Sequence, residues 1–107
     1  MRARSKRLFG PVLLTVAPQL VYTVPADRVA LLKWIRLVTD PDTAHFFDLC
    51  MDVHDFAHAL YWQASLPKRD ILVDNEETVL HAGETLIAAT SVDDVAVLWG
   101  SGAELLP

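Results

Sequence analysis

The chain has 107 residues, which fits one domain with one hydrophobic core and excludes large architectures such as kinases and barrel enzymes. Its formal net charge is −5 and 52% of its residues are hydrophobic, which argues against disorder and against a general nucleic-acid binder, since such binders are basic overall. This much apolar surface on a small body indicates burial against partner proteins.

Positive charge gathers at the N-terminus. Arg2, Arg4, Lys6 and Arg7 are four of the nine cations, and the rest of the chain has five cations against fourteen anions. We therefore expect a basic N-terminal arm over residues 1–7 and an acidic domain over residues 8–107. Such an arm binds a neighbouring acidic surface or a phosphate backbone, or remains a solvated tail. Because the domain is acidic, another copy of the protein could bind the arm, so we expect the arm's partner to be protein and not nucleic acid.

The segment after the arm does not predict export or membrane insertion. Leu8–Ala17 has the layout of a signal sequence, but Gly10 and Pro11 interrupt it and no small-residue cleavage site follows at once. Prolines within residues 8–26 argue against a spanning helix. Cys50 is the single cysteine, so an internal disulfide is excluded, which fits a reducing compartment.

The first half of the chain predicts strands. Short β-branched runs at Val12–Val16 and Leu20–Val24 are each followed by a proline-containing turn. Residues 28–38 fit two structures. Their odd positions form one apolar face of a strand, broken only by Lys33, whereas a helical stripe behind an N-cap at Asp27 fits the same residues. The flanking prolines favour the strand.

The second half continues this pattern after a turn at Thr39–Asp42. Further strands are expected at Thr43–Met51, Tyr61–Trp62, Ile71–Val73, Thr78–Leu80, Leu86–Thr90 and Val95–Trp99. Asp52–Leu60 fits a helical turn or a loop, Gly83 a tight turn with positive φ, and Gly100–Gly102 a bend after a strand. Seven or eight short antiparallel strands, spaced about ten residues apart, predict a single-domain, all-β sandwich of jelly-roll type.

No residue pattern predicts catalysis or a metal. Cys50, His54 and His58 would form one stripe if the segment were helical, but a structural zinc site needs four ligands. An apolar cysteine at a strand end and two surface histidines are the simpler interpretation. Ser65, Ser91 and Ser101 lack the nucleophile-elbow context, and adjacent carboxylates on a strand point to opposite faces. We expect no enzymatic activity and no cofactor.

Trp34, Trp62 and Trp99 are the candidate interface residues, because tryptophan commonly anchors protein interfaces. A sugar-binding face is the alternative for the same side chains. It would require two or three aromatic residues exposed in a row on one face of a sheet.

Three short segments carry a family resemblance. They are Val21–Ala26 (VYTVPA), Leu80–Leu86 (LHAGETL) and Ser101–Leu105 (SGAEL). Together, over residues 9–106, they resemble small β-sandwich structural proteins of tailed bacteriophages, in which such segments form a strand end, a hairpin and a terminal strand. The chain departs from that pattern with a His- and aromatic-rich insert at Asp52–Trp62. Six arginines against three lysines, one asparagine and abundant alanine and valine suggest a GC-rich genome, such as that of an actinobacterial phage.

The resemblance implies a non-enzymatic virion protein, assembled in the host cytoplasm, as a minor tail or tail-tip component. Its partners would be further copies of itself and neighbouring virion proteins, contacted through apolar faces and the arm. A head decoration or head–tail connector protein is the alternative within the virion. Two other classes remain: a carbohydrate-binding module that contacts the host envelope, and a cupin-type metal enzyme. The enzyme would need His45, His54, His58 and an acidic residue to converge on one barrel interior.

Overall fold

The computed structural model describes residues 6–39, 45–66, 71–74, 77–93 and 96–106. This part of the chain is almost entirely extended, with one 3₁₀ turn, η1 (Phe56–His58). Its strands are β1 (Lys6–Leu13), β2 (Gln19–Thr23), β3 (Val29–Thr39), β4 (His45–Met51), β5 (Ala59–Leu66), β6 (Ile71–Asp74), β7 (Thr78–Leu80), β8 (Thr85–Thr90) and β9 (Ala96–Leu105). None of the helices in the described ranges is long and apolar enough to cross a membrane.

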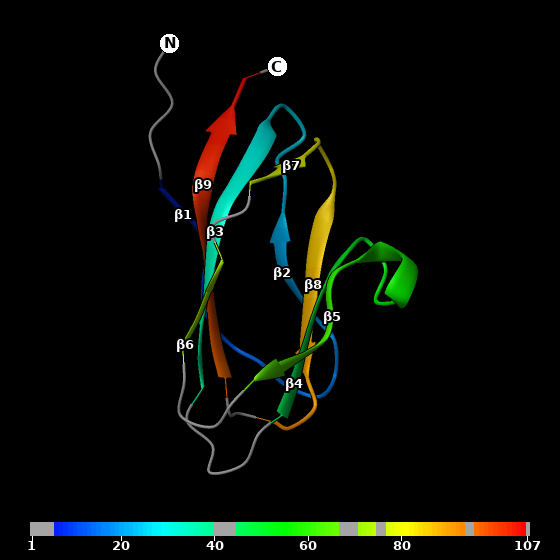
Figure 1. Ribbon diagram of the computed structural model, residues 1–107. Coiled ribbons are helices and arrows are strands. Elements are labelled where there is room, and N and C mark those ends of the chain that lie inside the picture. Colours follow the sequence, from blue (N-terminus) through cyan, green and yellow to red (C-terminus); the bar gives the residue numbers. More distant parts are fainter. Residues whose placement is uncertain (1–5, 40–44, 67–70, 75–76, 94–95, 107) are drawn as a thin grey trace.

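The strands form two antiparallel sheets that face each other (Figure 1). The β3–β9 sheet has the order β1-β9-β3-β6, with β7 also paired to β3, and the β4–β8 sheet has the order β2-β8-β4-β5. β1 pairs with β9, β2 with β8, β3 with β6 and β7, and β4 with β5. This nested pairing is that of a jelly-roll sandwich, so the predicted all-β sandwich is confirmed.

The strand count also follows the expectation. β6 pairs with β3 at Ile35–Val38, and β7 pairs with the same strand at Ala30–Leu32. They therefore act as one interrupted edge strand. Counted in that way, the described ranges contain eight strands, the upper of the two predicted numbers.

The core lies between the sheets, where side chains from both inner faces interdigitate. Leu37 and Leu98 come from the β3–β9 sheet, and Phe47 and Leu86 from the β4–β8 sheet; all four are fully buried. Along β3, buried positions alternate with more exposed ones on either side of Lys33, as in other face-to-face sandwiches.

Strand β3 confirms the extended interpretation of residues 28–38, with one correction. The expected apolar face of odd positions is not continuous, because the register with β9 shifts between Leu32 and Trp34. Ala30 and Leu32 are buried before this bulge, whereas Ile35 and Leu37 are buried after it. One extra residue moves the following side chains to the opposite face. The bulge at Lys33 therefore explains why both periodicities fitted this segment.

The predicted bend at Gly100–Gly102 is wrong, because β9 continues through it to Leu105. A Cβ at Gly102 would lie 1.7 Å from the Leu31 carbonyl oxygen, and a Cβ at Gly100 would lie 2.2 Å from the Phe9 ring. These glycines allow β3 and Phe9 to approach β9 closely, and they do not break the strand. Gly83, by contrast, has φ +81° in the turn after β7, as predicted.

Several strand boundaries differ from expectation. β1 starts at Lys6 and ends at Leu13, earlier than the predicted Val12–Val16 run, because Lys6 pairs with Gly102 in the extended β9. The predicted Tyr61–Trp62 strand is longer, since β5 pairs with β4 along most of its length.

Candidate functional site

The predicted N-terminal arm, residues 1–7, lies only partly within the described residues. Arg2 and Arg4 lie outside the described residues, whereas Lys6 and Arg7 begin β1 and pair with β9. The domain therefore starts two residues before the expected boundary at residue 8. The local turn signal at Gly100–Gly102 obscured this pairing of Lys6 and Arg7 with β9.

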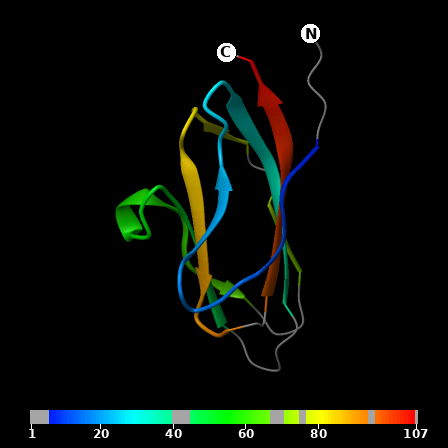
Figure 2. The same ribbon diagram turned by 180° about the vertical axis from the view of Figure 1, so that it is seen from behind.

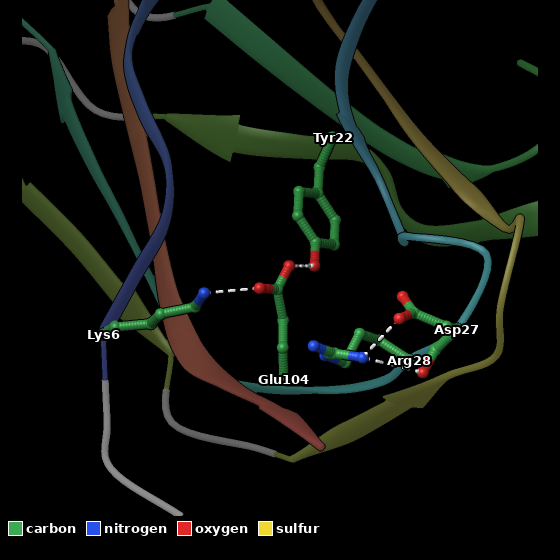
Figure 3. A network of polar contacts seen from close by, with 5 residues as sticks. All are labelled: Lys6, Tyr22, Asp27, Arg28 and Glu104. Atoms are coloured by element: carbon green, nitrogen blue, oxygen red, sulfur yellow. Dashed lines mark hydrogen bonds and ion pairs between the residues drawn. The ribbon is translucent and has the colours of Figure 1, made fainter. Parts of the chain in front are cut away.

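Lys6 belongs to a polar network at one end of the sandwich (Figure 3). Its ammonium group pairs with Glu104 of β9, and the Tyr22 hydroxyl of β2 donates to the other Glu104 oxygen at 2.5 Å. These hydrogen bonds, from Lys6 and then from Tyr22, lower the pKa of the Glu104 carboxyl. Burial, with the neighbouring carboxylate, raises the pKa of Tyr22. The network links three strands across both sheets, so Lys6 has a structural role.

Two of the three candidate tryptophans share one face. Trp34 on β3 pairs with Ser101, and Trp99 on β9 pairs with Arg36, so both rings occupy neighbouring diagonal positions. Their strand neighbours Ile35 and Leu98 are buried, which places Trp34 and Trp99 on the outer side of the β3–β9 sheet. The Arg36 guanidinium lies 5.6 Å from the Trp99 ring centroid, a cation–π distance.

Apolar side chains surround this pair. Trp34 is 36% exposed, Leu13 on β1 is 49% exposed and Val79 on β7 is 50% exposed. The register places all three on the same side of the sheet. We call this surface the outer face; its main apolar members are Leu13, Leu31, Trp34, Val79, Val97 and Trp99. The register places two charged strand residues on it, Arg7 and Arg36.

The outer face was only partly predictable. The tryptophans were candidates from sequence, but Arg36 and the aliphatic members were not. Leu31 and Val97 are of residue types that are typical of a core. Leu31 lies on the outer face because the bulge at Lys33 reverses which positions of β3 point inward.

Trp62 lies apart from the other two tryptophans, on β5 of the β4–β8 sheet. It contacts the segment that joins β4 to β5, residues 52–58, which we call the β4–β5 loop. The Trp62 ring lies 5.4 Å from the His54 ring and 6.3 Å, edge-on, from the Phe56 ring. Phe56 is 74% exposed. The loop protrudes from the sandwich on the side away from the β3–β9 sheet (Figures 1 and 2).

Carboxylates hold this loop in shape. The Asp52 carboxylate accepts a hydrogen bond from the Thr85 amide at 2.9 Å. The Asp55 carboxylate accepts one from the His58 amide at 2.9 Å and lies 2.7 Å from His58 Nδ1. The hydrogen bond from the His58 side chain holds the pKa of Asp55 below its usual range. At the loop base, Asp48 lies 3.0 Å from His54 Nε2. The loop is therefore an ordered protrusion with an exposed aromatic ring.

The candidate metal residues do not form a helical stripe. Cys50 lies near the end of β4 and is buried, and its thiol contacts the Asp55 carbonyl oxygen at 3.6 Å. His54 and His58 pair with separate carboxylates. Within the described ranges, no group of three or more His, Cys, Asp or Glu side chains is placed to hold a metal ion. The side chain of His45, the third histidine of the cupin-type alternative, lies outside the described part of the structure.

The serines have structural surroundings. Ser101 is buried within β9, and Ser65 lies in β5. The Ser91 hydroxyl accepts a hydrogen bond from the Phe46 amide at 2.8 Å.

Comparisons of the chain with protein-family models, with curated proteins and with solved structures find no match. The outer face and the β4–β5 loop are therefore interpreted from their own chemistry.

Proposed function

We propose that the protein is a non-enzymatic structural protein that acts by assembly, and that it serves as a minor tail or tail-tip component of a phage virion. The observation that carries this proposal is the outer face, which combines Trp34, Arg36 and Trp99 with exposed aliphatic side chains. Tryptophan and arginine are the residue types that dominate protein–protein binding energy. Exposed apolar residues gathered on one face commonly mark a protein interaction site.

The fold is compatible with this role without selecting it. Jelly rolls occur in viral capsid proteins, in lectin domains and in cupins, so architecture alone does not assign a function. The resemblance of the VYTVPA, LHAGETL and SGAEL segments supports the virion among these classes. A head decoration or connector protein would use the same surface with another partner.

One observation favours a second candidate, a carbohydrate-binding module. Trp34 and Trp99 are two aromatic residues side by side on one sheet face, as a sugar platform requires. However, Arg36 lies over the Trp99 ring, and the surrounding outer-face residues are aliphatic. Sugar recognition needs placed polar groups around the platform, so protein docking fits the surface better.

The test measures the solution mass of the full chain by light scattering, from micromolar to millimolar concentration and at low and high salt. Trp34→Ser removes an outer-face anchor, and Val92→Ser is the matched control, because Val92 is similarly exposed, at 40%, but lies outside the outer face. We expect discrete oligomers for the native chain and the control, and loss of oligomers for Trp34→Ser. A chain that binds arrayed glycans as a monomer, and loses that binding with Trp34→Ser, would contradict the proposal.

A further inference from the structure

The molecule presents two unlike surfaces on opposite sides. The outer face covers one side of the sandwich, and the β4–β5 loop stands out from the other (Figures 1 and 2). One surface is a broad sheet face and the other is a narrow protrusion. Their shapes and positions allow one molecule to present both at once, to two different neighbours.

The charges of these surfaces are opposite. The described strand residues of the outer face include two cations, Arg7 and Arg36, and no acidic residue. The loop carries Asp52 and Asp55 and no lysine or arginine. Both aspartates keep free acceptor positions beyond their internal hydrogen bonds, because an ionised carboxylate accepts about four.

The apolar groups are complementary as well. Phe56 is the most exposed of the large hydrophobic side chains in the described ranges, and its edge contact with Trp62 restrains its ring. Val53, in the same loop, is 47% exposed. An aromatic ring held in advance loses little side-chain entropy on binding, which favours its use as an anchor.

We propose that the β4–β5 loop of one copy docks on the outer face of the next copy, with Phe56 against the Trp34–Trp99 surface and the loop aspartates facing Arg7 and Arg36. This inference rests on the proposed function and names the partner of the outer face as a second copy of the chain. Such a contact joins two different surfaces, so it builds a closed ring or an open stack rather than a symmetric pair.

The charges disfavour the symmetric alternatives. Two outer faces packed against each other would bring Arg7 and Arg36 of both copies together, and two loops would bring aspartates together. Like charges placed across an interface suppress such pairings. The head-to-tail contact is the arrangement in which both sets of charges are matched.

The experiment uses two variants that each destroy one surface without changing net charge. Phe56→Ser removes the loop anchor, and Trp34→Ser removes the anchor on the outer face. Val92→Ser is the control, and Val79→Ser replaces Trp34→Ser if circular dichroism shows that the latter is unfolded. Sedimentation velocity measures each variant alone and the two mixed in equal amounts.

We expect each variant alone to be monomeric under conditions in which the native chain assembles, with affinity lowered roughly 30-fold, as for interface anchors. The mixture should give a heterodimer and nothing larger, because only one intact loop and one intact outer face remain in each pair. High salt should weaken the contact, since it screens the charges.

The outcomes separate this inference from the proposed function. If Trp34→Ser abolishes assembly but Phe56→Ser assembles like the native chain, the outer face is an assembly surface and the loop is not its partner. A mixture without heterodimer would also overturn the inference. A native chain that stays monomeric to millimolar concentration overturns it as well, and assigns the outer face to a different protein.

Discussion

Replacing Gly102 by alanine should separate the two longest strands of the fold. A Cβ at this position would lie 1.7 Å from the Leu31 carbonyl oxygen and 3.1 Å from the Lys33 amide nitrogen, both backbone atoms of β3. Restoring ordinary contact would require the strands to move apart by roughly 1.5–2 Å. Their register extends over ten residue pairs, so the shift cannot stay local.

The expected cost is at the upper end for overpacking, at least about 3 kcal/mol of unfolding free energy, because the obstructing atoms are backbone. That is a large part of the total stability of a domain, roughly 5–15 kcal/mol. Gly83→Ala is the control. Its φ of +81° strains alanine, but no atom lies within 4 Å of the new Cβ, so its cost should be only about 1–2 kcal/mol.

Urea unfolding followed by tryptophan fluorescence measures both variants. The close approach of β3 and β9 predicts a much lower urea midpoint for Gly102→Ala than for Gly83→Ala, or no folded state at all. Equal midpoints would refute the close approach of β3 and β9 on which the account of Gly100–Gly102 depends.

Three further predictions concern the polar network and the cysteine. Tyr22→Phe removes a hydrogen bond to a carboxylate and should cost about 1.5 kcal/mol in urea unfolding; a cost near zero would contradict that bond. Because the folded-state pKa of Glu104 is lowered, its contribution is complete above its unfolded pKa and is lost as pH falls through the folded value. The native chain should therefore lose more stability than Glu104→Gln between neutral pH and about pH 3, and parallel losses would contradict this. Burial raises the pKa of the Cys50 thiol, so it should react with Ellman's reagent only after unfolding; fast native reaction would be inconsistent with the structure.

Much of the fold could be predicted from local pattern. Alternation and turn residues indicated the strands of the sandwich, and the turn at Gly83 follows from the freedom of glycine at positive φ. The strand at residues 29–39 was harder to predict, because the bulge at Lys33 moves the apolar side chains from even to odd positions. A bulge depends on the partner strand, so a single segment does not reveal it.

Long-range contacts account for what the sequence concealed. Gly100 and Gly102 resemble a turn locally, but they are small because Phe9 and β3 lie against them. The tryptophans were candidates from the sequence, yet nothing local assigns Trp34 and Trp99 to one sheet and Trp62 to the other. Phe56, the proposed anchor of the β4–β5 loop, had no signal beyond its place in an unusual His- and aromatic-rich insert.

The central claim is that the outer face becomes buried on assembly, and hydroxyl-radical footprinting tests it most directly. The native chain is labelled at a dilute, monomeric concentration and at an assembled one, and oxidation of each side chain is read by mass spectrometry. The account predicts protection of Trp34 on assembly, with Leu20, which is 64% exposed on the opposite sheet, as the reference. Equal oxidation of Trp34 in both states, in a sample that has assembled, would contradict the claim.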